Sequence, residues 1–137
     1  MLNHRPELND TSALLILEAA RNHAIAIGVA QNIVIVDASG HMLAMCRMQG
    51  AKFLSIETAT AKAVTAASIA APTGNAPEEA GKLLGITTQG KFTNLKGGLP
   101  VIIDGQVAGA VGVGSGAPDQ DIAVAQAGID ALMQALA

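Results

Sequence analysis

The stretch Gly97–Pro118, with the sequence GGLPVIIDGQVAGAVGVGSGAP, contains two apolar runs separated by Asp104-Gly105. Asp-Gly is favoured in type I′ hairpin turns, because both central residues of such a turn need positive φ angles. The stretch therefore predicts an antiparallel hairpin with strands at 99–103 and 106–113. Pro118 suits the first turn of a helix, where its missing N–H costs no hydrogen bond, so a final helix is expected from there.

The rest of the chain shows helical and extended patterns that would surround this hairpin. The expected elements are a helix capped by Asp10 or Thr11 and ending near Gly28, strands at 33–36 and 42–48, a helix at 55–71, a short helix at about 75–85, and a strand at 91–95. Hairpins imply an antiparallel sheet, and helices at the start, middle and end of the chain must cover it. The sequence thus predicts an α/β fold of the α+β kind, with about five antiparallel strands covered by helices.

Length and charge restrict the classes of protein that fit. The 137 residues suffice for one domain, with residues 1–9 as a flexible arm and 10–137 as a single domain. The 8 basic and 11 acidic residues give a net charge of −3, which argues against nucleic acid, whose phosphates call for a basic face. No apolar run reaches the ~18 residues of a membrane span, and the N-terminus has no apolar signal segment. We therefore expect a cytoplasmic protein with no membrane partner.

The cysteine and histidine residues predict no metal site. Cys46 is the only cysteine, so neither an internal disulfide nor a cysteine metal cluster is expected. His4, His23 and His41 are not at metal-ligand spacing to one another. Any one of these histidines could still serve as a single axial ligand of haem.

Two glycine clusters are possible ligand contacts. Gly114-Ser115-Gly116 lies between the last strand and the last helix, where backbone N–H groups and the helix N-terminus can face an anion. Gly97-Gly98 enters the strand at 99–103, and the entry of one hairpin strand lies beside the exit of its partner. The two clusters should therefore be adjacent. The structural alternative is that the glycines only permit a sharp turn and close packing.

Two basic residues complete the predicted binding site. Lys62 is the only charge in the alanine-rich part of the helix at 55–71, and Arg47 ends the strand at 42–48. Each either extends into solvent or faces an acidic ligand. The predicted ligand-binding residues are Arg47, Lys62, Gly97, Gly98, Gly114, Ser115 and Gly116, and no catalytic residue is assigned.

Several segments in combination resemble the GlcG/HbpS-like family, which includes the C-terminal domain of PduO-type proteins and is often called haem-degrading. The matching segments are Ile35-Val36-Asp37-Ala38-Ser39-Gly40, Arg47-Met48-Gln49-Gly50-Ala51, Ala61-Lys62-Ala63 with Thr65-Ala66, Pro72-Thr73, Gly97-Gly98-Leu99-Pro100, Asp104-Gly105 through Gly109-Ala110-Val111-Gly112-Val113, and Pro118-Asp119-Gln120-Asp121. The resemblance implies a profilin-like fold with a five-stranded sheet, a homo-oligomer, and haem binding in some members.

Two functions remain open at this stage. The first is a small-ligand-binding protein for haem or a related cofactor, associated with a catabolic pathway, as the resemblance implies. The alternative is a small enzyme, an isomerase, lyase or hydrolase, acting on an organic acid. In that case Lys62 and Arg47 would hold the acid, and the backbone of Gly114-Ser115-Gly116 would stabilise an oxyanion.

Overall fold

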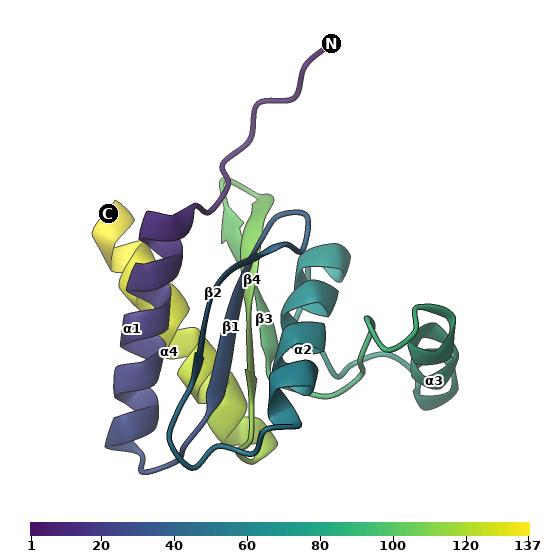
Figure 1. Ribbon diagram of the computed structural model, residues 1–137. Helices are drawn as coiled ribbons and strands as arrows, with labels where there is room; N and C mark the ends of the chain where they lie inside the picture. Colours follow the sequence, from purple (N-terminus) through teal and green to yellow (C-terminus); the bar gives the residue numbers. More distant parts are fainter.

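Four helices and four strands make up the protein in the computed structural model, which describes residues 1–137 (Figure 1). They are α1 (Asp10–Ala26), β1 (Asn32–Asp37), β2 (Met42–Arg47), α2 (Ser55–Ile69), α3 (Glu78–Thr87), β3 (Gly98–Ile103), β4 (Gln106–Gly114) and α4 (Pro118–Leu136). The strands form one open sheet in the order β2-β1-β4-β3, and every neighbouring pair is antiparallel. The predicted α+β fold is confirmed.

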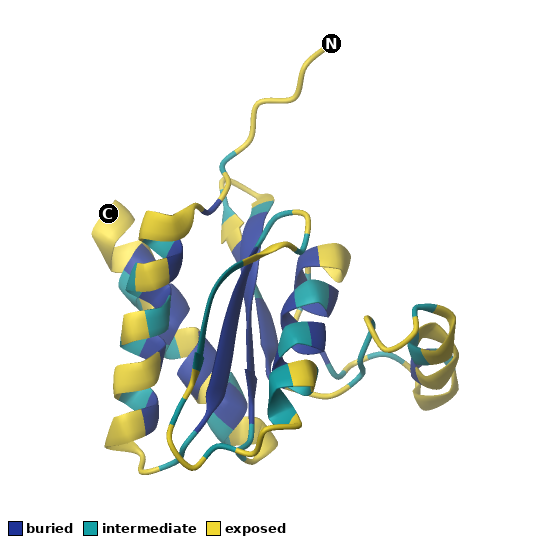
Figure 2. Cartoon of the chain, viewed as in Figure 1, coloured by how far each residue is buried: buried dark blue, intermediate teal, exposed yellow.

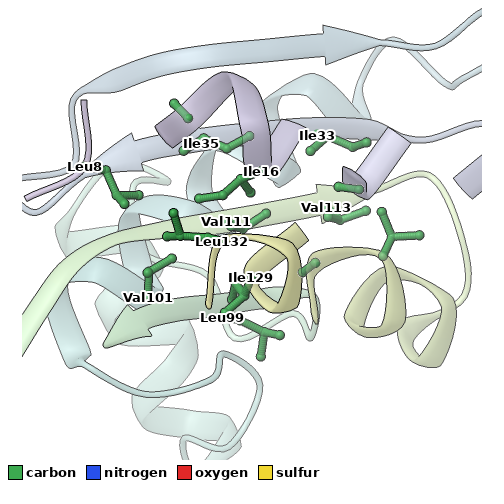
Figure 3. Packing of buried hydrophobic residues seen from close by; sticks show 14 of the residues in the cluster. Leu8, Ile16, Ile33, Ile35, Leu99, Val101, Val111, Val113, Ile129 and Leu132 are labelled. Carbon is green, nitrogen blue, oxygen red and sulfur yellow. The ribbon is translucent and has the colours of Figure 1, made fainter. Parts of the chain in front are cut away.

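Helices cover both faces of the sheet. Alternate β1 side chains point to opposite faces, so Ile33 and Ile35 join α1 and α4 in the larger hydrophobic cluster, which Figure 3 shows from close by. Val34 and Val36 instead pack against alanines of α2 in a second cluster. Residues 32–36 of β1 are consequently all buried, and only Asp37 at its end is half-buried (Figure 2). This two-sided burial explains why the β1 sequence is a continuous apolar run.

The predicted hairpin between β3 and β4 is confirmed. Asp104 and Gly105 have φ angles of 51° and 75°, so both central residues of the turn lie in the left-handed region that a type I′ turn needs. The two strands pair from Gly98 opposite Gly112 to Ile103 opposite Gln106.

The start of α1 differs from the prediction by a small shift. Asn9, not Asp10 or Thr11, caps the helix: its side chain accepts a hydrogen bond from the Ser12 N–H at 3.1 Å. Just before the cap, Leu8 is buried, and its N–H donates to the Ala108 carbonyl at 2.9 Å. The end of the N-terminal arm therefore lies against β4. The flexibility of residues 1–9 stays a prediction, as does the likeness to profilin.

The predicted strand at 91–95 is wrong, and the sheet has four strands instead of five. The segment lies beside α3, away from the sheet (Figure 1). Its N–H groups do not bond to a neighbouring strand: Phe92 donates to Thr88 Oγ1 at 2.9 Å, Thr93 donates to Thr65 Oγ1 at 3.0 Å, and Lys91 donates to the Thr88 carbonyl at 3.3 Å. An extended pattern forms a strand only where a partner strand is available.

Candidate functional site

Lys62 lies inside the protein and not in solvent. It is only 5% exposed, on the part of α2 that packs against β3 and β4. Its Nζ donates to the Val113 carbonyl at 2.8 Å and forms an ion pair with Asp121 Oδ2 at 3.2 Å. The lysine therefore links α2 to the end of β4 and to the first turn of α4.

Asp121 is the second member of this buried polar cluster. Its Oδ1 accepts a hydrogen bond from the Gly116 N–H at 3.0 Å. With its amide nitrogen facing Asp121, Gln31 donates to Oδ1 at 2.8 Å and to the Gly114 carbonyl at 2.9 Å. Burial raises the pKa of the Asp121 carboxyl, while Lys62, Gly116 and Gln31 act in the opposite direction. The carboxylate is held entirely by groups of the protein.

Gly97 and Gly98 lie beside Lys62, and Gly116 lies beside Gln31 and Asp121, so the protein itself fills the space next to these glycines. A Cβ on Gly97 would lie 3.0 Å from Lys62 Nζ, and one on Gly98 would lie 2.3 Å from the Lys62 carbonyl oxygen. A Cβ on Gly116 would lie 2.5 Å from the Gln31 amide. Glycine is needed at these positions because α2 and the polar cluster approach the backbone closely. This packing matches the structural alternative, and a ligand contact at these glycines stays a prediction.

Arg47 and Ser115 take separate positions at the same end of the sheet. Arg47 is exposed at the end of β2, opposite Asn32, which in turn pairs with Gly114. Ser115 has a φ angle of 88°, and its Oγ accepts a hydrogen bond from the Lys52 N–H at 2.9 Å. The structure thus places Lys62 next to Gly97 and Gly98, whereas Arg47 is exposed at the end of the edge strand β2.

Sequence reasoning missed three polar residues of this region. Asp121 lies in the first turn of α4, where an acidic side chain is common, so its sequence position alone does not mark it as the counter-charge that a buried Lys62 needs. Gln31 and Asn32, both fully buried, gave no signal at all. Asn32 donates through Nδ2 to the Lys52 carbonyl at 2.8 Å, and its Oδ1 has no partner in the protein.

Several hollows lie away from this polar cluster, and three of them adjoin Phe92. Three hollows of about 540, 340 and 250 Å³ adjoin this side chain, between α2, α3 and the segment that follows α3. The two smaller hollows also share Thr65, Ile69 and Leu84. None of the three includes a residue of the predicted binding set. These hollows could not be predicted from the sequence, because they depend on where α3 lies relative to α2.

Two further findings concern metals and membranes. No three His, Cys, Asp or Glu side chains lie close enough to one another to hold a metal ion. None of the helices is sufficiently long and apolar to cross a membrane.

Known proteins resemble this chain over most of its length. Residues 8–130 match a protein family described as haem degrading protein HbpS-like. An uncharacterised 15.0 kDa protein from the dhaT-dhaS intergenic region of Citrobacter freundii is 35% identical over 118 residues, covering 82% of this chain and 83% of that protein. Protein GlcG of Escherichia coli is 33% identical over 107 residues, covering 77% and 80%. The crystal structure of the PduOC:heme complex has a TM-score of 0.83 and 29% identity, covering 91% of this chain and 94% of that one.

Proposed function

Since this chain belongs to the HbpS-like family of haem-degrading proteins, we propose that it binds haem or a related small ligand without turning it over. The observation that carries this proposal is the fold shared with the PduOC:heme complex over 91% of the chain. The proposed binding role belongs to a catabolic pathway, as the family resemblance implies, and the proposed location is the cytoplasm.

The buried polar cluster argues against the enzyme alternative at these residues. An oxyanion site in the glycine loop would need free backbone donors, yet the Gly116 N–H is already bonded to Asp121. Lys62 likewise donates to Asp121 and to the Val113 carbonyl, and it is buried. An acid substrate at Lys62 would have to displace Asp121. The set Arg47, Lys62, Gly97, Gly98, Gly114, Ser115 and Gly116 stays a prediction for the ligand site.

Haemin titration followed at the Soret band tests the proposed function. We expect saturation at one haemin per chain, because a specific site fills once while adsorption to apolar surface continues without an endpoint. Weak, non-saturating haemin binding would contradict the proposal. If small hydroxy or keto acids then raised the melting temperature, the enzyme alternative would be favoured, since a ligand that binds the folded state stabilises it.

Self-association is part of the same proposal. Phe53, Leu54 and Ile86 are 69%, 67% and 75% exposed, and such apolar side chains are commonly covered by a partner. We expect light scattering to give at least twice the 13.7 kDa mass of one chain. A mass of one chain at micromolar concentration would contradict the homo-oligomer and leave the ligand proposal intact.

A further inference from the structure

Helix α3 stands apart from the rest of the protein. Figure 1 shows it beyond α2, away from the sheet, and it forms no extensive contact with any other helix or strand. The segment that follows it holds it in place: Asn94 exchanges two hydrogen bonds with the Ala76 backbone, at 2.8 and 3.0 Å, and Thr93 donates to Thr65 Oγ1 of α2 at 3.0 Å. Residues 76–94 therefore form a projecting unit, which we call the α3 arm.

The length and composition of α3 make its isolation unfavourable. It has 10 residues, fewer than the ~12–15 that an isolated helix needs for marginal stability in water. Leu83 and Ile86 are 56% and 75% exposed, and residues three apart lie on the same face of a helix. An exposed apolar stripe on a short helix without a packing partner indicates that something outside the chain covers it.

The open hollow of about 540 Å³ lies beside this stripe. Its lining includes two glycines of α3 and three large apolar side chains: Gly81, Gly85, Ile86, Phe92 and Leu95. Ile86 belongs to both the stripe and the hollow, so a body that covers one also reaches the other. The hollow has room for an aliphatic side chain from outside, and the stripe of another copy supplies such side chains. The α3 arm therefore fits a second copy of itself.

The charges of the α3 arm favour one orientation of two copies. Glu79 lies in the first turn of α3 and Lys91 lies just beyond its C-terminal end, and neither has an ion-pair partner within the chain. In a parallel pair of helices each charge would meet its own counterpart, and like charges repel. In an antiparallel pair around a twofold axis, Glu79 of each copy comes close to the partner's Lys91.

The spacing of these residues agrees with the antiparallel arrangement. Glu79 lies four residues before Leu83, and Lys91 lies five residues after Ile86. When Leu83 packs beside the partner's Ile86, the two opposite charges therefore reach nearly the same level along the pair of helices. Apolar side chains in the middle and opposite charges at both ends make the surface complementary to itself, as a twofold interface requires.

We propose that two copies of the chain pair through their α3 arms, antiparallel around a twofold axis. Leu83 of each copy packs against the partner's Ile86 and covers the hollow of about 540 Å³ beside it, while Glu79 faces the partner's Lys91. This inference rests on the proposed homo-oligomer, because it names the surface through which the copies associate.

Two exposed leucines provide a matched pair of variants. Leu83→Lys places a charge in the proposed contact and should weaken association about tenfold or more, which light scattering over a dilution series records as a lower average mass. Leu14 is 57% exposed on α1, and Leu14→Lys should leave the mass unchanged. Each new lysine lies four residues after an acid, Glu79 or Asp10, so neither substitution should weaken its own helix.

The outcomes of this comparison separate the surface from the oligomer. Both variants should keep the wild-type circular dichroism spectrum, since both leucines are exposed. A wild-type mass for Leu83→Lys at every concentration would overturn the inference, and an equal fall in mass for Leu14→Lys would do the same, because the effect would not be specific to the α3 arm. A wild-type protein with the mass of one chain would instead contradict the proposed homo-oligomer itself.

Reversal of the two charges tests the orientation. Glu79→Lys or Lys91→Glu alone places like charges together at both ends of the pair and should weaken association about fivefold or more at low salt, and less at high salt. The double variant Glu79→Lys, Lys91→Glu restores opposite charges and should return the association constant to within about twofold of the wild-type value. A double variant as weak as the single ones would overturn the antiparallel pairing, as would single reversals without effect at low salt.

Discussion

Replacing Lys62 with Met is expected to lower the free energy of unfolding by about 3–5 kcal/mol, because it leaves the buried Asp121 carboxylate without its cation. Stabilities of small domains are only about 5–15 kcal/mol, so much of the total would be lost. Chemical denaturation with urea at neutral pH, monitored by circular dichroism, measures the difference. A loss below about 1 kcal/mol would contradict a structural role for the ion pair.

The pH dependence of this loss gives a second readout. Without Lys62, burial raises the folded-state pKa of Asp121 above its unfolded value. An acid with a raised folded pKa binds its proton more tightly in the folded state, so stability falls as pH rises from the unfolded pKa through the folded one. We therefore expect the Lys62→Met deficit to be smaller near pH 4 than at pH 7.

The control for Lys62→Met removes both charges. A Lys62→Met, Asp121→Asn double variant should recover part of the stability lost in the single variant, because it removes the unpaired buried charge while the amide oxygen can still accept from Gly116 and Gln31. The coupling between the two sites follows from the double-mutant cycle. If the double variant were as unstable as the sum of the single ones, the pair would not be acting as a unit. Because Lys62→Met is expected to be unstable, its ligand affinity must be measured under conditions in which the variant is folded.

Replacing Gly112 with Ala is expected to be the most damaging one-carbon change in the sheet. Its Cβ would lie 2.0 Å from the Ala59 carbonyl oxygen and 2.5 Å from the Ala63 nitrogen, both on the backbone of α2. Since neither atom can rotate away, β4 and α2 must separate, and overpacking of this kind costs about 1–3 kcal/mol or more. We expect the free energy of unfolding to fall by an amount at or above the upper end of that range, and thermal unfolding measures this loss.

Gly85→Ala is the matched control for this prediction. Neither glycine has a positive φ angle, so alanine is allowed at both backbones. In α3 the new Cβ would meet only the Phe92 carbonyl, at 3.5 Å. Because alanine favours helix over glycine by up to about 1 kcal/mol, Gly85→Ala should be neutral or stabilising. Equal losses at Gly112 and Gly85 would show that backbone preference, and not the contact with α2, decides the effect.

The sequence alone determined those parts of the fold that depend on neighbouring residues. Asp104-Gly105 fixes the β3–β4 turn through two residues that accept positive φ angles. The alanine-rich stretch before Pro72 predicts α2, and Pro118 marks the start of α4. The combined segments also indicated the HbpS-like family, which the match over residues 8–130 confirms.

Only the tertiary structure decided which distant residues meet. Lys91–Leu95 has an extended pattern but no partner strand, so side chains such as Thr65 take its hydrogen bonds. Lys62 could equally have extended into solvent. It is buried because Asp121, 59 residues further along the chain, supplies the opposite charge. Strand pairing, burial of charge and the open space beside Phe92 all depend on how whole elements pack, and no local pattern contains that information.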